Sequence, residues 1–490
     1  MYITLIFGYT TILPSEEEKM LESKAWFEVD KEGFKELQLG KSKAYILREL
    51  IQNAWDENIK VCKVSTEFDN RSVKITVEDD NPEGFKDLRD AFTLFKHTNK
   101  RQDTSKRGRF NIGEKQVIAV CDEAYIETTK GTVAFLEDGR HQLVRKREKG
   151  SAVILNLRMD FSEYEAMLKS LDVYLTPQGI RTIVNGKVLG YKIPYKIITA
   201  NLQTEVDEKG ILKKTMRNTE LHIHKVIQDE PTFLYELGIP VTSIECQYSI
   251  DVQQKIPLNI DRETVSQSFL RDVFAEVLNA TAQEITPEQS SQVWIREATG
   301  DERIQTEAVK QVIEKRYGDK VLVANPFDRN SIDEAISQGY RVIYGSELSK
   351  EEWTNIKKEN LILATSDVFG TSFADSAPFT DLTEGHLLVK ALAQKIAKRI
   401  LDINLTVNFV KSQASCAAQY GNGTLTFNIS KLPQTYFEDY LRTIKLIVHE
   451  LGHHYGNHTE NSYHEALTDM AQQLVMIALT EPTFFELREA

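Results

Sequence analysis

The sequence has few cysteines, which limits the covalent and metal chemistry open to it. Only four occur among 490 residues, at Cys62, Cys121, Cys246 and Cys416. They form no Cys-x-x-Cys pair, which argues against a disulfide framework and against a thiolate zinc site, and favours a reducing compartment. Ten histidines are present, so a metal site built on imidazole stays open.

Long apolar runs, repeats and Pro/Gly-rich linkers are also absent. No stretch approaches the roughly 18 uninterrupted apolar residues of a membrane-spanning helix. The apolar start Met1–Leu5 lacks the basic flank and the long apolar core of a signal peptide. Apolar residues make up 41% and charged residues 27% of the chain, which is typical of a globular protein. We therefore expect a cytoplasmic protein with no membrane contact.

Basic residues are outnumbered by acidic ones. The chain has 60 Lys and Arg against 73 Asp and Glu, giving a net charge of −13. Such a balance disfavours general nucleic-acid binding and leaves a protein as the expected partner, although a local basic patch is compatible with it.

Shifts in pattern along the chain predict four segments of mixed α/β and α+β character. They cover residues 1–160, 161–295, 296–375 and 376–490. The first contains an amphipathic helix over residues 40–60, a helix over 86–96 and a basic loop over 97–109. In the third, apolar strands at residues 320–324, 340–344 and 360–364 alternate with helical patterns. The fourth combines helices at 387–400, 435–455 and 463–480 with strands at 405–410 and 424–429.

Polar residues in the first segment suggest a ligand site. Glu49, Asn53 and Asp56 are spaced i, i+4 and i+7, so they share one helix face. A carboxylate beside an amide suits a base that orients water and a ligand for Mg²⁺. A solvated helix face is the alternative for these three residues.

Three further clusters follow in order along the chain. Asp79-Asp-Asn-Pro-Glu-Gly84 comes after a strand, and on its own it is also consistent with a simple turn. The stretch from Gly108 to Lys115 includes Asn111 and Gly113, and it precedes a helix whose start could approach phosphate. Gly150-Ser151 leads into another strand.

Taken together, the four clusters resemble the GHKL ATPase superfamily, which includes gyrase, the heat-shock chaperone, the histidine kinases and MutL. The resemblance covers residues 40–157 and implies a Bergerat-type α/β sandwich that binds ATP and Mg²⁺. By it, Glu49 is the general base, Asn53 the magnesium ligand and Asp79 the acceptor for the adenine amino group. Ser151 supports Asp79 through water, and Gly84 passes close to the nucleotide. The phosphates are wrapped by Gly108, Asn111, Gly113 and Lys115, and Asp56 belongs to the same binding surface.

The sequence departs from the family pattern in places. An Asn stands at the first glycine of the second motif, which has one extra residue, and Asn111 replaces a usual lid glycine. Asn tolerates left-handed backbone better than most residues. Ile256-Pro-Leu-Asn-Ile-Asp-Arg262-Glu resembles a stretch of the heat-shock chaperone's middle domain. This makes residues 161–295 transducer-like and Arg262 the γ-phosphate sensor, with an exposed arginine as the alternative.

The C-terminal segment holds a second constellation, His449-Glu450-Leu-Gly-His453. Two histidines at i and i+4 on one helix can meet one Zn²⁺, and the glutamate between them can act as a base. For the third ligand we rank Glu465 first, then His458 and His464, and we expect Asp469 to be the outer partner of a ligand histidine. The arrangement resembles the zincin metallopeptidases, gluzincins most closely. That resemblance makes the strand at residues 424–429 the edge that aligns a peptide.

These observations predict an ATP-regulated zinc metalloprotease acting on a protein substrate. Its parts are an ATP-binding module that dimerises, a transducer-like middle domain, a small α/β connector and a zincin-like domain. The alternatives are a chaperone-like or scaffold ATPase with an inactive zincin domain, and a protease whose nucleotide domain only senses ATP. By analogy with phage and bacterial defence proteins that carry GHKL modules, a role in phage–host conflict is also conceivable.

Overall fold

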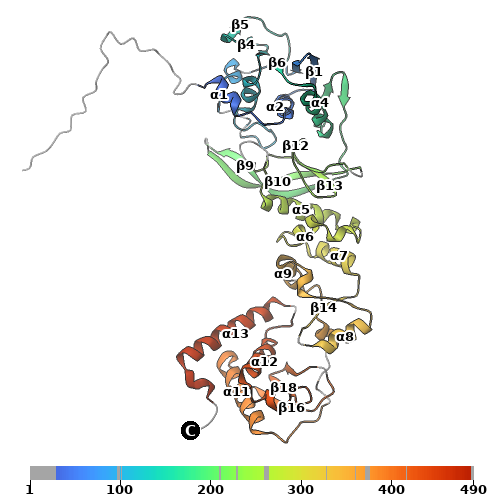
Figure 1. Cartoon of the computed structure of the whole chain (residues 1–490), viewed down its shortest axis with the longest axis vertical. Helices are drawn as coiled ribbons and strands as arrows, with labels where there is room; N and C mark the ends of the chain where they lie inside the picture. The colour runs from blue at the N-terminus through green and yellow to red at the C-terminus, as the bar shows by residue number, and fades with distance from the viewer. Residues whose placement is uncertain are drawn as a thin grey trace, which may run out of the picture. The chain divides into compact units, whose positions relative to one another are not determined.

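The computed structural model describes residues 29–486, apart from gaps at 86, 97–99, 101, 209–210, 228–229, 259–263, 327, 359, 370–372, 374–375, 415 and 459. The chain divides into two compact units. Unit 1 takes in the chain up to Lys192 together with Val206–Ile211 and Leu237–Ile239, and unit 2 takes in the remainder. Both units mix helices and strands, as predicted (Figure 1). None of the four cysteines, all of which lie in the described part of the chain, forms a disulfide.

Unit 1 is built on an eight-stranded sheet with the order β5-β4-β3-β6-β2-β1-β7-β8. Neighbouring strands run antiparallel except β1 and β7, which are parallel. The strands are β1 (Val61–Asp69), β2 (Ser72–Asp79), β3 (Glu123–Glu127), β4 (Thr132–Leu136), β5 (Gly139–Leu143), β6 (Ala152–Arg158), β7 (Arg181–Val184) and β8 (Lys187–Leu189). The boundary predicted at residue 160 falls inside this unit, because β7 and β8 complete its sheet.

Helix α2 (Ala44–Trp55) anchors the polar residues of the first cluster to the core of unit 1. Its apolar face, with Ile46, Leu47 and Ile51 fully buried, follows the predicted helical spacing. The other α-helices are α1 (Lys31–Glu36), α3 (Gly113–Ala119) and α4 (Phe161–Lys169). The helix predicted over residues 86–96 is limited to the 3₁₀ turn η1 (Leu88–Ala91), because Phe95 adopts left-handed backbone with φ +54°.

Unit 2 begins with a five-stranded sheet of order β12-β11-β13-β10-β9. Its strands are β9 (Lys196–Glu208), β10 (Ile211–Lys225), β11 (Phe233–Glu236), β12 (Ile239–Ser243) and β13 (Tyr248–Val252), followed by helices α5 (Gln267–Thr281), α6 (Val293–Thr299) and α7 (Thr306–Tyr317). Phe269, Val273 and Val277 of α5 share one apolar core with the sheet and with Trp294 of α6. The side chain of Ser266 caps α5 at Phe269 N.

The connector follows within unit 2. It pairs β14 (Val321–Val323) in parallel with β15 (Arg341–Ile343), and it includes helices α8 (Arg329–Ser337), α9 (Lys350–Lys358) and α10 (Thr365–Phe369). The strand predicted at residues 360–364 is reduced to a single bridge between Val323 and Ala364, because the chain turns directly into α10.

The C-terminal part of unit 2 packs α11 (Glu384–Leu401), α12 (Tyr440–Gly452) and α13 (Asn461–Thr480) around a three-stranded sheet. The sheet order is β16-β18-β17, with β16 (Thr406–Val410), β17 (Ala418–Gly421) and β18 (Thr424–Asn428). The expectation that residues 424–429 form the edge strand is wrong, because β18 pairs on both sides. The edge strand that contacts α12 is β17.

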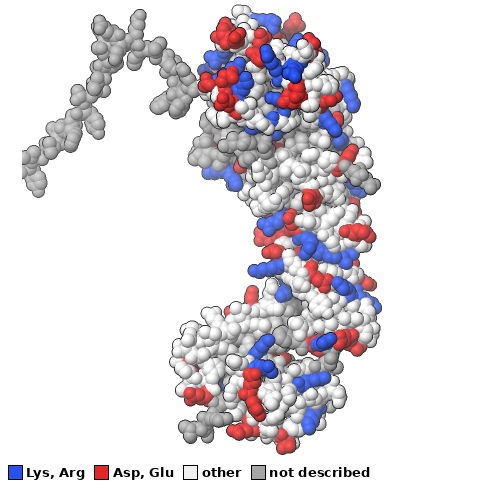
Figure 2. Space-filling model, viewed as in Figure 1, with Lys and Arg blue, Asp and Glu red and all other residues white. Residues whose placement is uncertain are grey.

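Charged side chains of both signs alternate over the face of the described residues drawn in Figure 2. None of the helices in the described residues combines the length and apolarity needed to cross a bilayer.

Candidate functional site

Helix α12 fixes the first two histidines of the predicted metal site. It begins after Asp439, whose side chain accepts from the backbone N–H of Arg442 at 3.2 Å. Ile447 and Leu451 are fully buried and hold the helix against the core. At its end Gly452 lets α13 approach, since a Cβ there would lie 2.8 Å from the ring of Tyr463. The helix therefore has little freedom to move.

Three histidines converge at the end of α12. One ligand atom from each of His449, His453 and His458 lies within 4.8 Å of the others. The Nε2 atoms of His449 and His458 are 3.2 Å apart. Zinc–nitrogen bonds of about 2.0–2.1 Å in tetrahedral geometry place neighbouring ligand nitrogens about 3.3–3.4 Å apart. The donor set and the separation of His449 from His458 therefore fit a zinc ion, and His453 lies within 4.8 Å of both.

The outward ring nitrogens of two of these histidines are already hydrogen-bonded. Tyr463 Oη lies 2.8 Å from His449 Nδ1 and donates to the His449 carbonyl at 3.3 Å. With a hydrogen on Nδ1, the hydroxyl accepts from the ring while it donates to the carbonyl. His453 Nδ1 is 3.2 Å from the carbonyl of Gly456, which can only accept. Both imidazoles consequently present a lone pair at Nε2, the arrangement that metal-binding histidines adopt.

The protonation state also suits metal binding. Burial, with the neighbouring His453 and Lys445, lowers the pKa of His449 to about 4. Burial and the adjacent histidines lower the pKa of His458 to about 3, and burial lowers that of His453 as well. Neutral imidazole at neutral pH is the form that binds a cation.

The third position of the cluster belongs to His458 rather than to Glu465. Glu465 and Asp469 are exposed on α13, and neither belongs to the cluster. Tyr463 points from α13 into the cluster, and a residue two places further along a helix faces about 200° away. His464 donates from Nε2 to the carbonyl of His458 at 2.7 Å. The geometry thus replaces the first-ranked ligand by the second-ranked one.

Glu450 lies on the buried side of the same helix. Its side chain is hydrogen-bonded at Oε2 by the backbone N–H of Tyr420, at 3.1 Å. Burial raises the pKa of Glu450 to about 8, and the Tyr420 N–H partly opposes that rise. A cation at the histidines would favour the carboxylate and lower the pKa. Because Tyr420 belongs to β17, the exposed edge of the sheet is joined directly to this glutamate.

In unit 1, Glu49 is packed against the segment that precedes α3. It is 5% exposed, and it accepts from Gln52 Nε2 while Arg48 Nε lies 3.5 Å from its Oε1. A Cβ at Gly113 would lie 1.8 Å from Glu49 Oε2, so a larger residue here would displace the Glu49 carboxylate. Asn53, one turn along α2, is half-buried. The first and third sequence clusters therefore meet at Glu49.

The second and fourth clusters meet at Asp79. Its Oδ1 accepts from the backbone N–H groups of Asn81 at 2.9 Å and Ser151 at 3.2 Å. Burial raises the pKa of Asp79 despite these two donors. Gly84 adopts φ +60°, and a Cβ there would lie 2.7 Å from Thr129 Oγ1. The structure thus joins Asp79 to the backbone N–H of Ser151, and the support through water that the resemblance implies stays a prediction.

Asp56 holds the glycine-rich segment and does not face a ligand. Its Oδ1 accepts from the backbone N and from Nη1 of Arg107, both at 3.0 Å, and its Oδ2 accepts from Gly108 N at 2.8 Å. The side chain is fully buried. Burial alone raises the pKa, but the Arg107 and Lys100 cations outweigh it, so the pKa of Asp56 is lowered. A role in positioning replaces the direct contact expected from the sequence.

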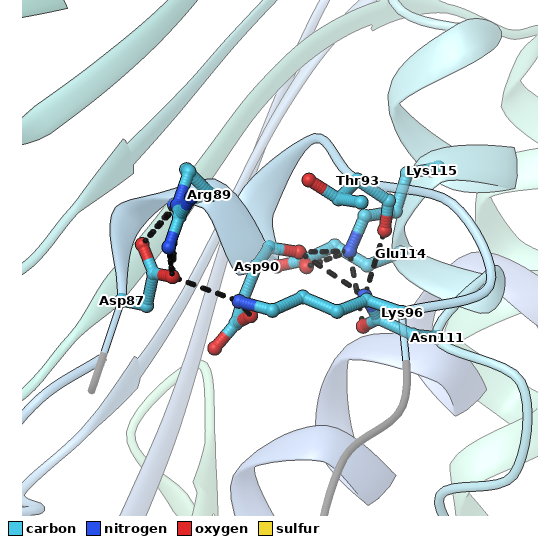
Figure 3. Close-up of polar contacts among 8 residues, drawn as sticks. All are labelled: Asp87, Arg89, Asp90, Thr93, Lys96, Asn111, Glu114 and Lys115. Carbon is cyan, nitrogen blue, oxygen red and sulfur yellow. Dashed lines mark hydrogen bonds and ion pairs between the residues drawn. The ribbon is translucent and has the colours of Figure 1, made fainter. Parts of the chain in front are cut away.

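Asn111 takes the left-handed backbone expected of it, with φ +54°. Its Nδ2 donates to the Thr93 carbonyl at 2.8 Å. Lys115 Nζ donates to Asn111 Oδ1 at 3.2 Å, to Glu114 Oε2 at 3.3 Å and to the Asp90 carbonyl. Figure 3 shows this network together with Lys96, which pairs with Asp87 and Asp90, and Arg89, which pairs with Asp87. The Lys96, Lys115 and Arg89 side chains drawn in Figure 3 are therefore each paired with oxygen atoms of the protein.

Other contributors carry no signal in the sequence. Ser366 of α10 places Oγ 3.2 Å from His458 Nδ1, although the two residues are 92 positions apart. Tyr463 and Tyr420 reach the site through packing, and no spacing rule points to them. Arg262, the predicted γ-phosphate sensor, lies outside the described residues.

Comparison with known proteins gives no match to a family model and none to a curated protein. Two solved structures of the ATPase region of Saccharomyces cerevisiae topoisomerase II are similar to part of the chain. One has a TM-score of 0.28 at 12% identity, covering 40% of this chain and 61% of that one. The other, bound to ICRF-187 (dexrazoxane), has a TM-score of 0.27 at 13% identity, covering 40% and 62%. This chain therefore spans about three-fifths of their length. TM-scores this low carry no argument, so the nucleotide site rests on its own residues.

Proposed function

We propose that this chain is a zinc-dependent peptidase joined to an ATP-binding module. The observation that carries the proposal is the convergence of His449, His453 and His458 beside a buried Glu450. Two of the histidines have oxygen partners at Nδ1, and the Nε2 of His449 lies 3.2 Å from that of His458. This arrangement is what a zinc ion requires of its ligands.

His449, His453 and His458 would hold the metal, and Glu450 would move the proton. Bound zinc would supply electrophilic polarisation of a peptide carbonyl. Glu450 accepts a proton from the attacking water at a carboxylate oxygen and delivers it to the leaving amide nitrogen. The Tyr420 N–H orients this carboxylate. Strand β17, at the sheet edge beside α12, would align an extended peptide by backbone hydrogen bonds.

Glu450→Gln tests the peptidase directly. Cleavage of a fluorescently labelled unfolded protein should fall about 10²–10⁴-fold, the usual loss when a general base is removed, while zinc content stays at the wild-type level. Glu438→Gln, an exposed acid in the same domain, is the matched control and should cleave normally. Equal cleavage by Glu450→Gln, or no cleavage by the zinc-loaded wild type, contradicts the proposal. Wild type without zinc would instead favour a chaperone-like or scaffold ATPase with an inactive zincin domain.

The second part of the proposal is an ATP and Mg²⁺ site in unit 1. Glu49 is the general base, Asn53 the magnesium ligand and Asp79 the partner of the adenine amino group. The proposal is supported by the packing of Gly113 on Glu49 and by the joining of Asp79 to Ser151. The segments that contain Asp79 and Gly113 also contain the other residues of the proposed site, Gly84, Gly108, Asn111 and Lys115.

Asp79→Asn tests this site. The substitution replaces a charged carboxylate, which only accepts hydrogen bonds, by a neutral amide that has one accepting oxygen and a donating NH₂ group. Hydrogen bonds to charged groups are worth about 1.5–3 kcal/mol, so ATP affinity should fall roughly 10–150-fold. Asp69→Asn, at the exposed end of β1, is the control. Unchanged ATP affinity in Asp79→Asn would contradict the assignment of Asp79 as the partner of adenine.

We further propose that this module forms a homodimer and that the substrate is a protein.

A further inference from the structure

We propose that the connector supplies a positioning residue for the metal site. Ser366 of α10 holds the His458 imidazole so that its Nε2 faces the other two histidines. This inference rests on the proposed zinc site. His449 and His453 are held by Tyr463 and Gly456, which belong to the same domain as the ligands. His458 alone is held at Nδ1 from another segment of unit 2, by Ser366 Oγ at 3.2 Å.

Ser366 is itself part of a buried polar network in the connector. Asn325, which follows β14, donates from Nδ2 to Ser366 Oγ at 3.1 Å. Its backbone N–H donates to Thr365 Oγ1 at 3.2 Å, and Ser331 of α8 donates to the same atom at 2.9 Å. Asn325, Thr365 and Ser331 are each at most 5% exposed. The position of the Ser366 hydroxyl is therefore set by the core of the connector and not by a mobile surface side chain.

The chemistry of the hydroxyl fits this role. A serine oxygen has two lone pairs, so it has room to accept from Asn325 and from an Nδ1–H of His458 at the same time. His458 then carries its proton on Nδ1 and presents a lone pair at Nε2. That tautomer matches those of His449 and His453, so all three rings offer the same atom to one cation.

A second connector helix reaches the same loop. His464 Nε2 donates to the carbonyl of His458 at 2.7 Å, and Lys357 Nζ of α9 lies 3.0 Å from that nitrogen. Because Nε2 carries a hydrogen, the lysine contact is one of packing and not a hydrogen bond. Two connector helices thus contact the ring and the backbone surroundings of the third ligand. Zinc affinity therefore depends on how the connector is seated, and the connector is the element through which the site can be regulated.

Ser366→Ala in the full chain tests the inference, with zinc affinity measured by competition against a chromophoric chelator. Loss of an outer hydrogen-bond partner typically weakens metal binding about 10–100-fold, and we expect that range. Ser366→Thr keeps the hydroxyl and should stay near wild type. Ser337→Ala removes a connector hydroxyl that donates only to the Glu334 carbonyl of its own helix, and it should have no effect.

Circular dichroism of the chelator-treated proteins verifies that each variant is folded. A folded Ser366→Ala variant with wild-type zinc affinity overturns the positioning role while leaving the zinc site intact. Wild type that binds no zinc overturns the proposed function itself, and this inference with it.

Discussion

Hydrogen bonds to single oxygen atoms set the direction in which each histidine of the cluster faces. Tyr463 Oη fixes His449, the Gly456 carbonyl fixes His453, and Ser366 Oγ fixes His458. Of these, the contact at His453 has a settled direction, because the Gly456 carbonyl can only accept. The Tyr463 hydroxyl lies between the His449 ring nitrogen and the His449 carbonyl. The metal site is therefore as much a product of these outer partners as of the histidines.

Tyr463→Phe removes that hydroxyl and leaves the ring packing in place. We expect zinc affinity to fall about 10–100-fold, measured by chelator competition on the full chain. Tyr455→Phe is the control, because Tyr455 is 50% exposed. Equal zinc affinity in Tyr463→Phe and wild type would mean that the hydroxyl does not orient His449.

The sequence predicts some of these residues and misses others for a clear reason. His449, Glu450 and His453 lie within one helical turn of each other, so spacing alone places them together. The third ligand lies beyond the end of α12, where its direction depends on how α13 docks. The ranking of Glu465 above His458 assumed that Glu465 lies on the face of α13 that points to the histidines. In the structure Tyr463 lies on that face, and Glu465 is exposed.

At the scale of elements, the crossing of α12 and α13 shapes the proposed zinc site. Gly452 is the point of closest approach, with Tyr463 and Leu467 both within 3.0 Å of a hypothetical Cβ. Because Tyr463 also carries the hydroxyl that holds His449, any shift of α13 is passed to the metal ligands.

Gly452→Ala should therefore destabilise the domain and loosen the site together. Overpacking of this kind costs about 1–3 kcal/mol, which thermal unfolding of the full chain would register, and zinc affinity should fall in parallel. Gly421→Ala places its methyl group where nothing lies within 4 Å and serves as the control. A destabilised Gly452→Ala protein with unchanged zinc affinity would show that the packing of α13 on α12 does not position the zinc ligands.

The Asp56–Arg107 pair governs the glycine-rich segment of unit 1. Asp56→Asn leaves the Arg107 charge buried without its partner, and breaking such a pair costs about 3–5 kcal/mol. The pKa of Asp56 is lower in the folded state than its unfolded value of about 3.9. Its contribution is therefore complete above pH 4 and is lost as the pH falls toward the folded pKa. Urea unfolding should show a wild-type advantage at pH 7 that shrinks below pH 4. An advantage that persists unchanged in acid contradicts the pair's role.

Helices and strands could be predicted from sequence, whereas their neighbours could not. Apolar spacing identifies α2, α12 and β18 within a few residues. The residues of β18 alone do not predict that it lies in the middle of its sheet, because strand order also depends on the neighbouring strands β16 and β17. For the same reason β7 and β8 look like the start of a new segment, although they pair into the first sheet.

At the scale of the whole molecule, two candidate sites lie in one chain of two compact units. The four polar clusters predicted to bind ATP gather in unit 1, and the histidine cluster lies in unit 2. The net charge of −13 favours a protein over a nucleic acid as the partner of such a molecule. If one site regulates the other, a coupling free energy links ligand binding at the two sites. The size of that energy has to be measured.

ATP should change the rate of protein cleavage severalfold, since typical coupling energies are about 1–3 kcal/mol. The change should disappear in Asp79→Asn, which is impaired in ATP binding but keeps the peptidase residues. Cleavage that is identical with and without ATP would show two independent activities in one chain.

The zinc content of the purified full chain tests the central claim most directly. Mass spectrometry of wild type should find about one zinc per chain, the number that one three-histidine site holds. His458→Gln should lose most of it, and Glu465→Gln should retain it. Zinc-free wild type, or loss of zinc in Glu465→Gln but not in His458→Gln, would contradict the site assigned to His449, His453 and His458.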